Sequence, residues 1–167
     1  MIKKTLISLF FFAVSAGCAF GQIGRSVDEF KKSKFAVQEG FKFHDSYLIT
    51  EDPLYQGKYA FNFFTADKRY KLQIIADRLG KAIVFEYLFY PVADNEMIAL
   101  KDGSITLDFV SQSSGGKVSA DQYISLVCEA NAGNRNVKYT RKIEDFIVAL
   151  TRYDNKMISG WSIGVNK

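Results

Sequence analysis

Hydrophobic and polar residues alternate along the first half of the chain, a pattern typical of half-buried β-strands. Four such runs cover residues 41–50, 58–65, 70–76 and 81–90. The fourth is apolar on both faces apart from Glu86, and Pro91 ends it. Short connections between runs favour antiparallel pairing, because parallel strands need long crossovers. We therefore expect a four-stranded meander whose fourth strand is central and covered on both sides.

Helix starts are indicated by two capping boxes, in which a serine and a Glu or Gln three residues later cap each other's amides. The first, at Ser26, predicts a helix over about 27–37. Its inward face would carry Val27, Phe30, the stem of Lys34 and Val37.

The second capping box, at Ser119, opens a helix that Gly133 ends. Its expected apolar stripe comprises Tyr123, Ile124, Val127, Cys128 and Asn131. Between the two helices, the pattern predicts a short helix over 94–101, capped by Asp94 and followed by Gly103, and then a strand over 104–111. The remaining runs, 137–143, 145–153 and 156–165, predict three strands, the last two forming a hairpin.

This order of elements predicts an α+β fold. We expect an antiparallel sheet, with a meander of about four strands plus a C-terminal hairpin region, packed with two main helices. At the level of architecture, the order resembles small exported helix-plus-sheet binding modules such as the beta-lactamase-inhibitor-protein-like folds, although no family motif accompanies it. Because no Pro-rich or Ser-rich linker divides the chain, residues 22–167 are expected to form a single domain.

Residues 1–21 have the pattern of a secretory signal peptide: Lys3 and Lys4, an apolar run, then small residues. The apolar run is shorter than the roughly 20 residues that span a bilayer, and no later segment approaches that length. Cleavage before Gln22 would release a free periplasmic or secreted protein. The alternative is cleavage before Cys18, where Ser15-Ala16-Gly17-Cys18 resembles the lipobox of bacterial lipoproteins and implies a lipid anchor in the envelope.

Removing this leader changes the charge of the protein. The Lys and Arg count falls from 22 to 20 against 18 acidic residues, so the formal net charge falls from +4 to +2. A nearly balanced surface gives no electrostatic footprint for nucleic acid. Cleavage before Gln22 also leaves Cys128 as the single cysteine, which excludes a disulfide framework and cysteine-based zinc sites within one chain.

Catalytic motifs are scarce. His44, the single histidine, has Asp45 beside it, but adjacent strand residues point to opposite faces. Cys128 is expected to be a buried small hydrophobe on its helix. Gly115-Gly116-Lys117 lacks the spacing of a P-loop and indicates an ordinary surface loop. The sequence therefore predicts neither a cofactor nor a dedicated metal site.

Aromatic residues are the unusual feature that remains, with 11 Phe, 9 Tyr and 1 Trp from Gln22 onward. Tyrosines form cores with their hydroxyls at the rim, and they also form binding faces. The preferred hypothesis is an exported, non-enzymatic binding module for a protein, glycan or lipid. Its expected ligand surface is the exposed side of the first sheet around Tyr59, Tyr70 and Tyr87.

Two other functions stay open. One is a small exported hydrolase using acids such as Glu51, Asp52 or Glu86. Glu86 interrupts an apolar strand, and a buried acid often has a shifted pKa. The structural alternative for Glu86 is an edge or solvent-facing position, or a structural partnership with Lys71. The other function is an envelope assembly or structural protein.

Overall fold

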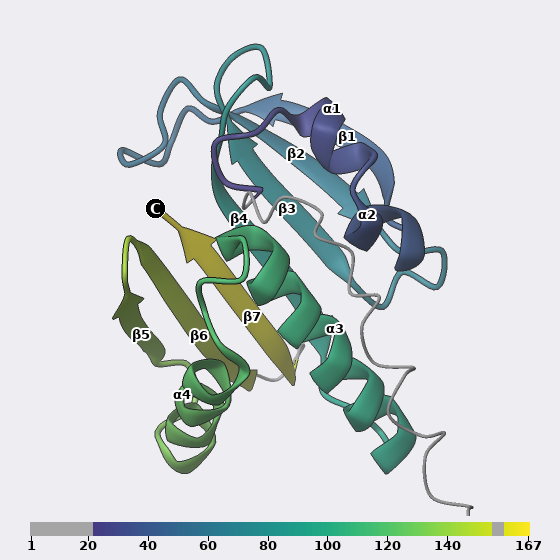
Figure 1. Cartoon of the computed structure of the whole chain (residues 1–167), viewed down its shortest axis with the longest axis vertical. Helices are drawn as coiled ribbons and strands as arrows, with labels where there is room; N and C mark the ends of the chain where they lie inside the picture. The colour runs from purple at the N-terminus through teal and green to yellow at the C-terminus, as the bar shows by residue number, and fades with distance from the viewer. Residues whose placement is uncertain (1–21, 155–158) are drawn as a thin grey trace, which may run out of the picture.

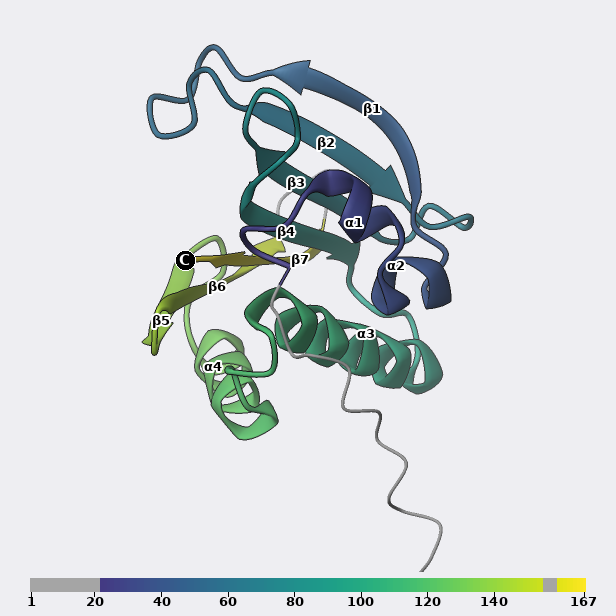
Figure 2. The same cartoon turned by 45° about the horizontal axis from the view of Figure 1, so that its top comes forward.

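The computed structural model describes residues 22–154 and 159–167 of the chain. The expected leader, with both of its candidate cleavage points, and Cys18 lie outside the described residues. Within them the chain has the α+β fold that the sequence predicts, with four helices on one face of a seven-stranded antiparallel sheet (Figures 1 and 2). The elements in chain order are α1 (Val27–Lys31), α2 (Lys34–Gln38), β1 (Lys42–Leu48), β2 (Tyr59–Phe64), β3 (Lys71–Ala76), β4 (Ile83–Pro91), α3 (Glu96–Ser114), α4 (Ala120–Ala132), β5 (Lys138–Ile143), β6 (Phe146–Asp154) and β7 (Ser159–Asn166).

The sheet consists of two antiparallel runs joined in the middle. The strand order is β1-β2-β3-β4-β7-β6-β5, so the predicted meander is confirmed and β4 is central, as expected. The pairing of β4 with β7 joins the meander to the C-terminal strands. Pro91 is the last residue of β4 and lies opposite Gly160, where a Cβ would come within 2.6 Å of the Tyr90 carbonyl oxygen.

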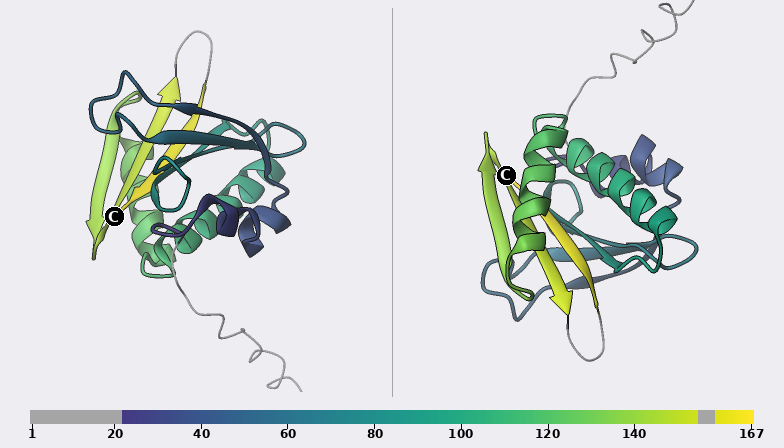
Figure 3. Two further views of the ribbon diagram at one scale, coloured as in Figure 1. Left: turned by 90° about the horizontal axis from the view of Figure 1, so that it is seen from above. Right: turned by 90° about the horizontal axis from the view of Figure 1, so that it is seen from below.

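The hydrophobic core lies between the sheet and the helices. Phe30 of α1 packs edge-on against Phe63 of β2, with ring centroids 5.0 Å apart, and Phe35 of α2 lies 6.1 Å from Phe109 of α3. Figure 3 shows the helices on one face of the sheet from both sides, and α3 packs on β4 and β7 while α4 packs on β5 and β6. Each fully buried side chain of this size contributes about 1.5–3 kcal/mol through removal from water.

The first predicted helix is two short helices. Ser26 makes the expected capping box with Glu29, but α1 ends after Lys31, and Ser33 caps α2 by accepting from the Ala36 amide at 3.2 Å. The new cap changes which face is inward, because α2 buries Phe35 and Ala36. Lys34 and Val37, expected inside, are exposed.

The predicted short helix at 94–101 and strand at 104–111 are wrong, because one helix, α3, runs from Glu96 to Ser114. Asn95, not Asp94, caps it by accepting from the Ile98 amide at 3.0 Å, and Gly103 lies inside it. The buried positions of α3 follow the 3.6-residue period. They are Asp102, Ile105, Thr106, Phe109, Val110, Ser113 and Ser114. Because several of these residues are polar, the pattern of apolar residues alone does not reveal the buried face.

The second main helix, α4, has the predicted capping box between Ser119 and Gln122 and the predicted end at Gly133. Its inward face is rotated from the expected one and carries Tyr123, Leu126 and Ala130. As a result Cys128, expected to be buried, is exposed.

Strand β1 forms one edge of the sheet, and all seven of its residues are exposed. A bulge between Phe43 and Asp45 takes His44 out of the pairing register with β2, although its ring lies edge-on against Phe64 with centroids 5.3 Å apart. The bulge also explains why His44 Nε2 lies 3.9 Å from the Asp45 carboxylate although neighbours on a regular strand diverge. Over the described ranges, no helix has the length and hydropathy needed to cross a membrane.

The placement of Gly103 inside α3 predicts the outcome of a substitution. A Cβ at this position meets nothing within 4 Å, so Gly103→Ala is expected to raise the free energy of unfolding by about 0.5–1 kcal/mol, as measured by urea denaturation. Gly115, the C-cap of the same helix, has a φ of 67°, so Gly115→Ala is expected to cost about 1 kcal/mol. Loss of stability on Gly103→Ala would contradict a continuous α3.

Candidate functional site

The three tyrosines expected to form one binding surface lie on different faces of the sheet. Tyr59 precedes Phe61 and Phe63 on the helix-facing side of β2, and Tyr70 is completely buried on the same side. Tyr87 lies on the opposite side of the sheet, in register with Gln73. Because successive side chains on a strand point to opposite faces, three tyrosines on different strands share a face only if the register of the strands places them there.

The face opposite the helices, here the outer face, carries an aromatic ladder. Tyr87 lies between Phe85 and Phe89, with ring centroids 4.0 and 5.7 Å away. Tyr55, from the loop between β1 and β2, packs on Phe85 at 5.6 Å. Burial raises the pKa of Tyr87 to about 12, so its hydroxyl stays protonated.

A hollow of about 420 Å³ lies beside this ladder. The loop before Tyr55 contributes Glu51 and Asp52, two of the acids proposed for hydrolysis, to its lining. Both are exposed, and Asp52 accepts a hydrogen bond from the Leu54 amide at 2.9 Å. Asp52 therefore shapes the loop in the way that acids commonly do in turns.

Glu86 is buried inside the core on the helix-facing side of β4. Its carboxyl group accepts a hydrogen bond from the Ser113 hydroxyl of α3, and Lys71, the expected partner, lies on the outer face. The side-chain amide of Gln22 faces the same group, and its nitrogen can lie 3.0 and 3.2 Å from the two oxygens. Burial raises the pKa of Glu86 to about 7, while the bond from Ser113 acts in the opposite direction.

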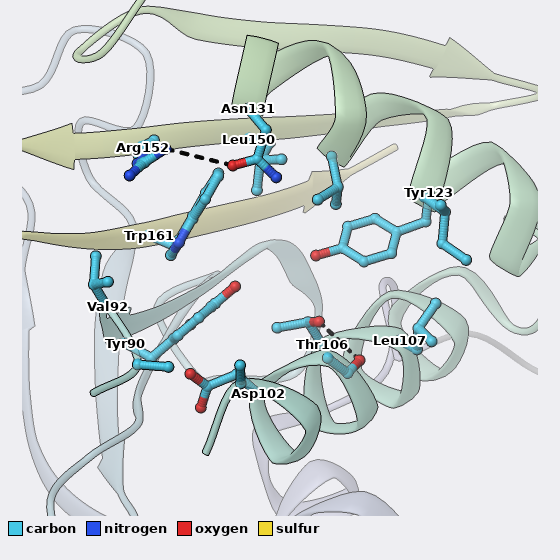
Figure 4. A pocket seen from close by; sticks show the side chains of 15 residues that line it. Tyr90, Val92, Asp102, Thr106, Leu107, Tyr123, Asn131, Leu150, Arg152 and Trp161 are labelled. Atoms are coloured by element: carbon cyan, nitrogen blue, oxygen red, sulfur yellow. Dashed lines mark hydrogen bonds between the residues drawn. The ribbon is translucent and has the colours of Figure 1, made fainter. Parts of the chain in front are cut away.

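A pocket of about 450 Å³ opens between α3, α4 and the end of the sheet formed by β4, β7 and β6 (Figure 4). We call it the α3–α4 pocket. Its walls are mainly apolar and aromatic, and the hydroxyls of Tyr90 and Tyr123 both point into the space. The lining residues with apolar side chains are Val92, Ala93, Ala99, Leu107, Ile124, Val127 and Leu150, together with the ring of Trp161.

The acid of this pocket, Asp102 on α3, is already paired. Arg69, in the turn before β3, donates to its two oxygens from Nε at 3.0 Å and from Nη2 at 2.6 Å. The Tyr70 hydroxyl also donates to Asp102, and burial followed by this bond raises the pKa of Tyr70. The side chains of Arg69 and Asp102 are 15% and 7% exposed, so the pair is largely removed from water.

Three residues on adjacent strands form a row along the pocket. Trp161 of β7 lies between Tyr90 of β4 and Arg152 of β6, and each is directly opposite its neighbour in the register. The Arg152 guanidinium lies 5.6 Å from the centre of a Trp161 ring, a cation–π distance. Arg152 also donates a long hydrogen bond of 3.5 Å to the side-chain oxygen of Asn131 on α4.

Sequence analysis did not identify this row or Asp102 as site residues. A signal is present for Arg152, because it continues the inward series Phe146, Val148 and Leu150 along β6. A charged residue at an inward position of a strand, next to the single tryptophan on its partner strand, could have marked the pocket.

Neither reactive side chain singled out from the sequence lies in the pocket. His44 is exposed on β1, and Cys128 is exposed on α4. Among residues 22–154 and 159–167, no three His, Cys, Asp or Glu side chains are grouped so that they could hold a metal ion. Lys117, in the loop after α3, forms ion pairs of 3.6 and 4.0 Å with Glu144 and Asp145.

Comparison of the chain with protein-family models, with curated proteins and with solved structures finds no match.

The raised pKa of Glu86 predicts how stability depends on pH. The folded state holds this proton up to a pKa of about 7, whereas the unfolded chain releases it near the ordinary value of 4.5. The unfolded state binds fewer protons in this window, so the free energy of unfolding falls as pH rises from 4.5 to 7, by a total on the order of 3 kcal/mol.

Glu86→Gln, which stays neutral, is expected to remove this slope, as measured by urea denaturation at a series of pH values. The exposed Glu51→Gln variant is the control and should keep it. A wild-type minus Glu86→Gln difference that stays constant from pH 4.5 to 8 would refute the assignment.

Proposed function

We propose that the chain is an exported, non-enzymatic binding module and that the α3–α4 pocket holds its ligand. The supporting observation is the pocket itself, a concave space of about 450 Å³ with mainly apolar walls and a few convergent polar groups. Ligand sites for small molecules have this size and composition. The ligand is therefore a small molecule with a substantial apolar part.

Export is the second part of the proposal and rests on the leader-like pattern of residues 1–21. Cleavage before Gln22 would give a periplasmic or secreted protein. Cleavage before Cys18 would tether the same binding domain to the envelope by a lipid.

The hydrolase alternative is supported less well by the geometry. Glu86 lines neither the α3–α4 pocket nor the outer-face hollow, and its partners are core residues. Glu51 and Asp52 remain as candidates at the hollow. If they served hydrolysis, hydrolytic activity would survive Glu86→Gln and be lost on Asp52→Asn.

An envelope assembly protein is a second candidate function, favoured by the aromatic ladder of Phe85, Tyr87 and Phe89 on the outer face. Aromatic side chains are enriched in protein interfaces. Co-fractionation with a large membrane complex, lost on Tyr87→Ser, would support this role in place of a small-molecule carrier.

The pocket predicts saturable binding of a neutral apolar probe, N-phenyl-1-naphthylamine, at one site. Trp161 is the single tryptophan and lines the pocket, so quenching of its fluorescence reports on this site. Ala99→Phe places a ring at the pocket wall and is expected to weaken binding about tenfold or more, because the filled space no longer admits the probe.

The control is Ser104→Phe, an exposed position on the same helix that does not line the pocket, which should bind as the wild type does. Absence of saturable quenching in the wild type, or equal affinity in both variants, would reject the pocket as the binding site.

A further inference from the structure

Three residues lining the α3–α4 pocket carry donor groups that have no acceptor within the described ranges. Arg152 presents five N–H groups, and the long bond to Asn131 is the single hydrogen bond of its guanidinium within the described ranges. Among the described residues, the Tyr90 hydroxyl and the Trp161 indole N–H also have no hydrogen-bond partner. Burial raises the pKa of Tyr90, which keeps its hydroxyl protonated and able to donate.

The charge of Arg152 is likewise uncompensated. No carboxylate among the described residues forms an ion pair with it. Residues 1–21 and 155–158 contain no Asp or Glu, so they have no carboxylate to offer. Asp102 is the acid in the lining, and its oxygens are engaged by Arg69 and Tyr70. The pocket therefore holds one net positive charge.

The position of Arg152 over the Trp161 ring leaves its charged guanidinium able to bind a ligand. A guanidinium that lies against an aromatic face keeps the N–H groups at its edge free to donate. Its planar fork matches the two oxygens of a carboxylate, and charge-assisted bonds of this kind are about twice as strong as neutral ones. An apolar wall nearby strengthens such bonds by excluding water.

We propose that the ligand of the α3–α4 pocket is a monocarboxylate with an aromatic or aliphatic body, and that Arg152 binds its carboxylate. The proposal rests on the proposed function and adds the chemical class of the ligand. Tyr90 and Trp161 supply further donors beside Arg152, and the apolar body lies against Leu107, Ile124 and Val127. A phosphate monoester carries close to two negative charges and would leave one unpaired in an apolar space.

The test compares ligands that differ in a single group. 4-Phenylbutyrate, 4-phenylbutan-1-ol and 4-phenylbutyl phosphate are titrated against the protein, with Trp161 fluorescence and calorimetry as readouts. On the unmodified chain the carboxylate is expected to bind about tenfold or more tighter than the alcohol, and tighter than the phosphate. This comparison does not depend on any variant folding.

Arg152→Gln is then expected to bring carboxylate and alcohol to within about twofold of each other, because the carboxylate loses its charged partner. Arg152→Lys, which keeps the charge but loses the fork, should retain part of the preference. The matched control is Arg141→Gln on the neighbouring strand β5, whose guanidinium is paired with Glu129 outside the pocket and whose loss should leave the preference intact.

The outcomes separate the two proposals. Equal affinity for carboxylate and alcohol, or tighter binding of the phosphate, would overturn the monocarboxylate while leaving the pocket as a binding site. A carboxylate preference that survives Arg152→Gln would overturn the role of Arg152. If neither the alcohol nor the neutral naphthylamine binds, the proposed function fails as well.

Discussion

The ion pair between Arg69 and Asp102 is the interaction on which both the shape and the charge of the pocket depend. It fastens the first half of α3 to the turn before β3, with side chains that are 15% and 7% exposed. Removing one partner of such a pair leaves a buried charge and typically costs about 3–5 kcal/mol. The same pair neutralises the charge of Asp102. Arg152 across the pocket consequently keeps its charge available for a ligand.

Much of the sheet could be predicted from the sequence, because strand alternation and capping boxes are local signals. The meander, the central position of β4 and both ends of α4 follow from residues close together in the chain. Helix α3 could not be found in this way. Its buried stripe includes Asp102 and Ser113, whose partners Arg69 and Glu86 lie 33 and 27 residues away. Hydrophobic periodicity does not detect a polar residue that is buried because of a distant partner.

The candidate site could not be predicted from the sequence either, because its residues lie far apart in the chain. The α3–α4 pocket is assembled from β4, α3, α4, β6 and β7, with Tyr90 and Trp161 brought opposite each other only by the pairing of β4 and β7. Glu86 is unusual in the sequence because it interrupts an apolar strand, and in the structure it is buried, with Ser113 as its hydrogen-bond partner and the Gln22 amide facing it. The burial of an acid therefore does not by itself distinguish a catalytic role from a role in stability.

Strand β1 has a consequence for how copies of this chain meet. An exposed outermost strand offers its free backbone groups as a template on which another molecule can extend the sheet. Here the bulge at His44 interrupts that template, and Lys42 and Asp45 place charges along it. Phe43 and Tyr47 on the same strand, 49% and 50% exposed, would otherwise favour stacking into fibrils. The irregularity at His44 thus makes this exposed edge a poorer template for pairing with a second copy.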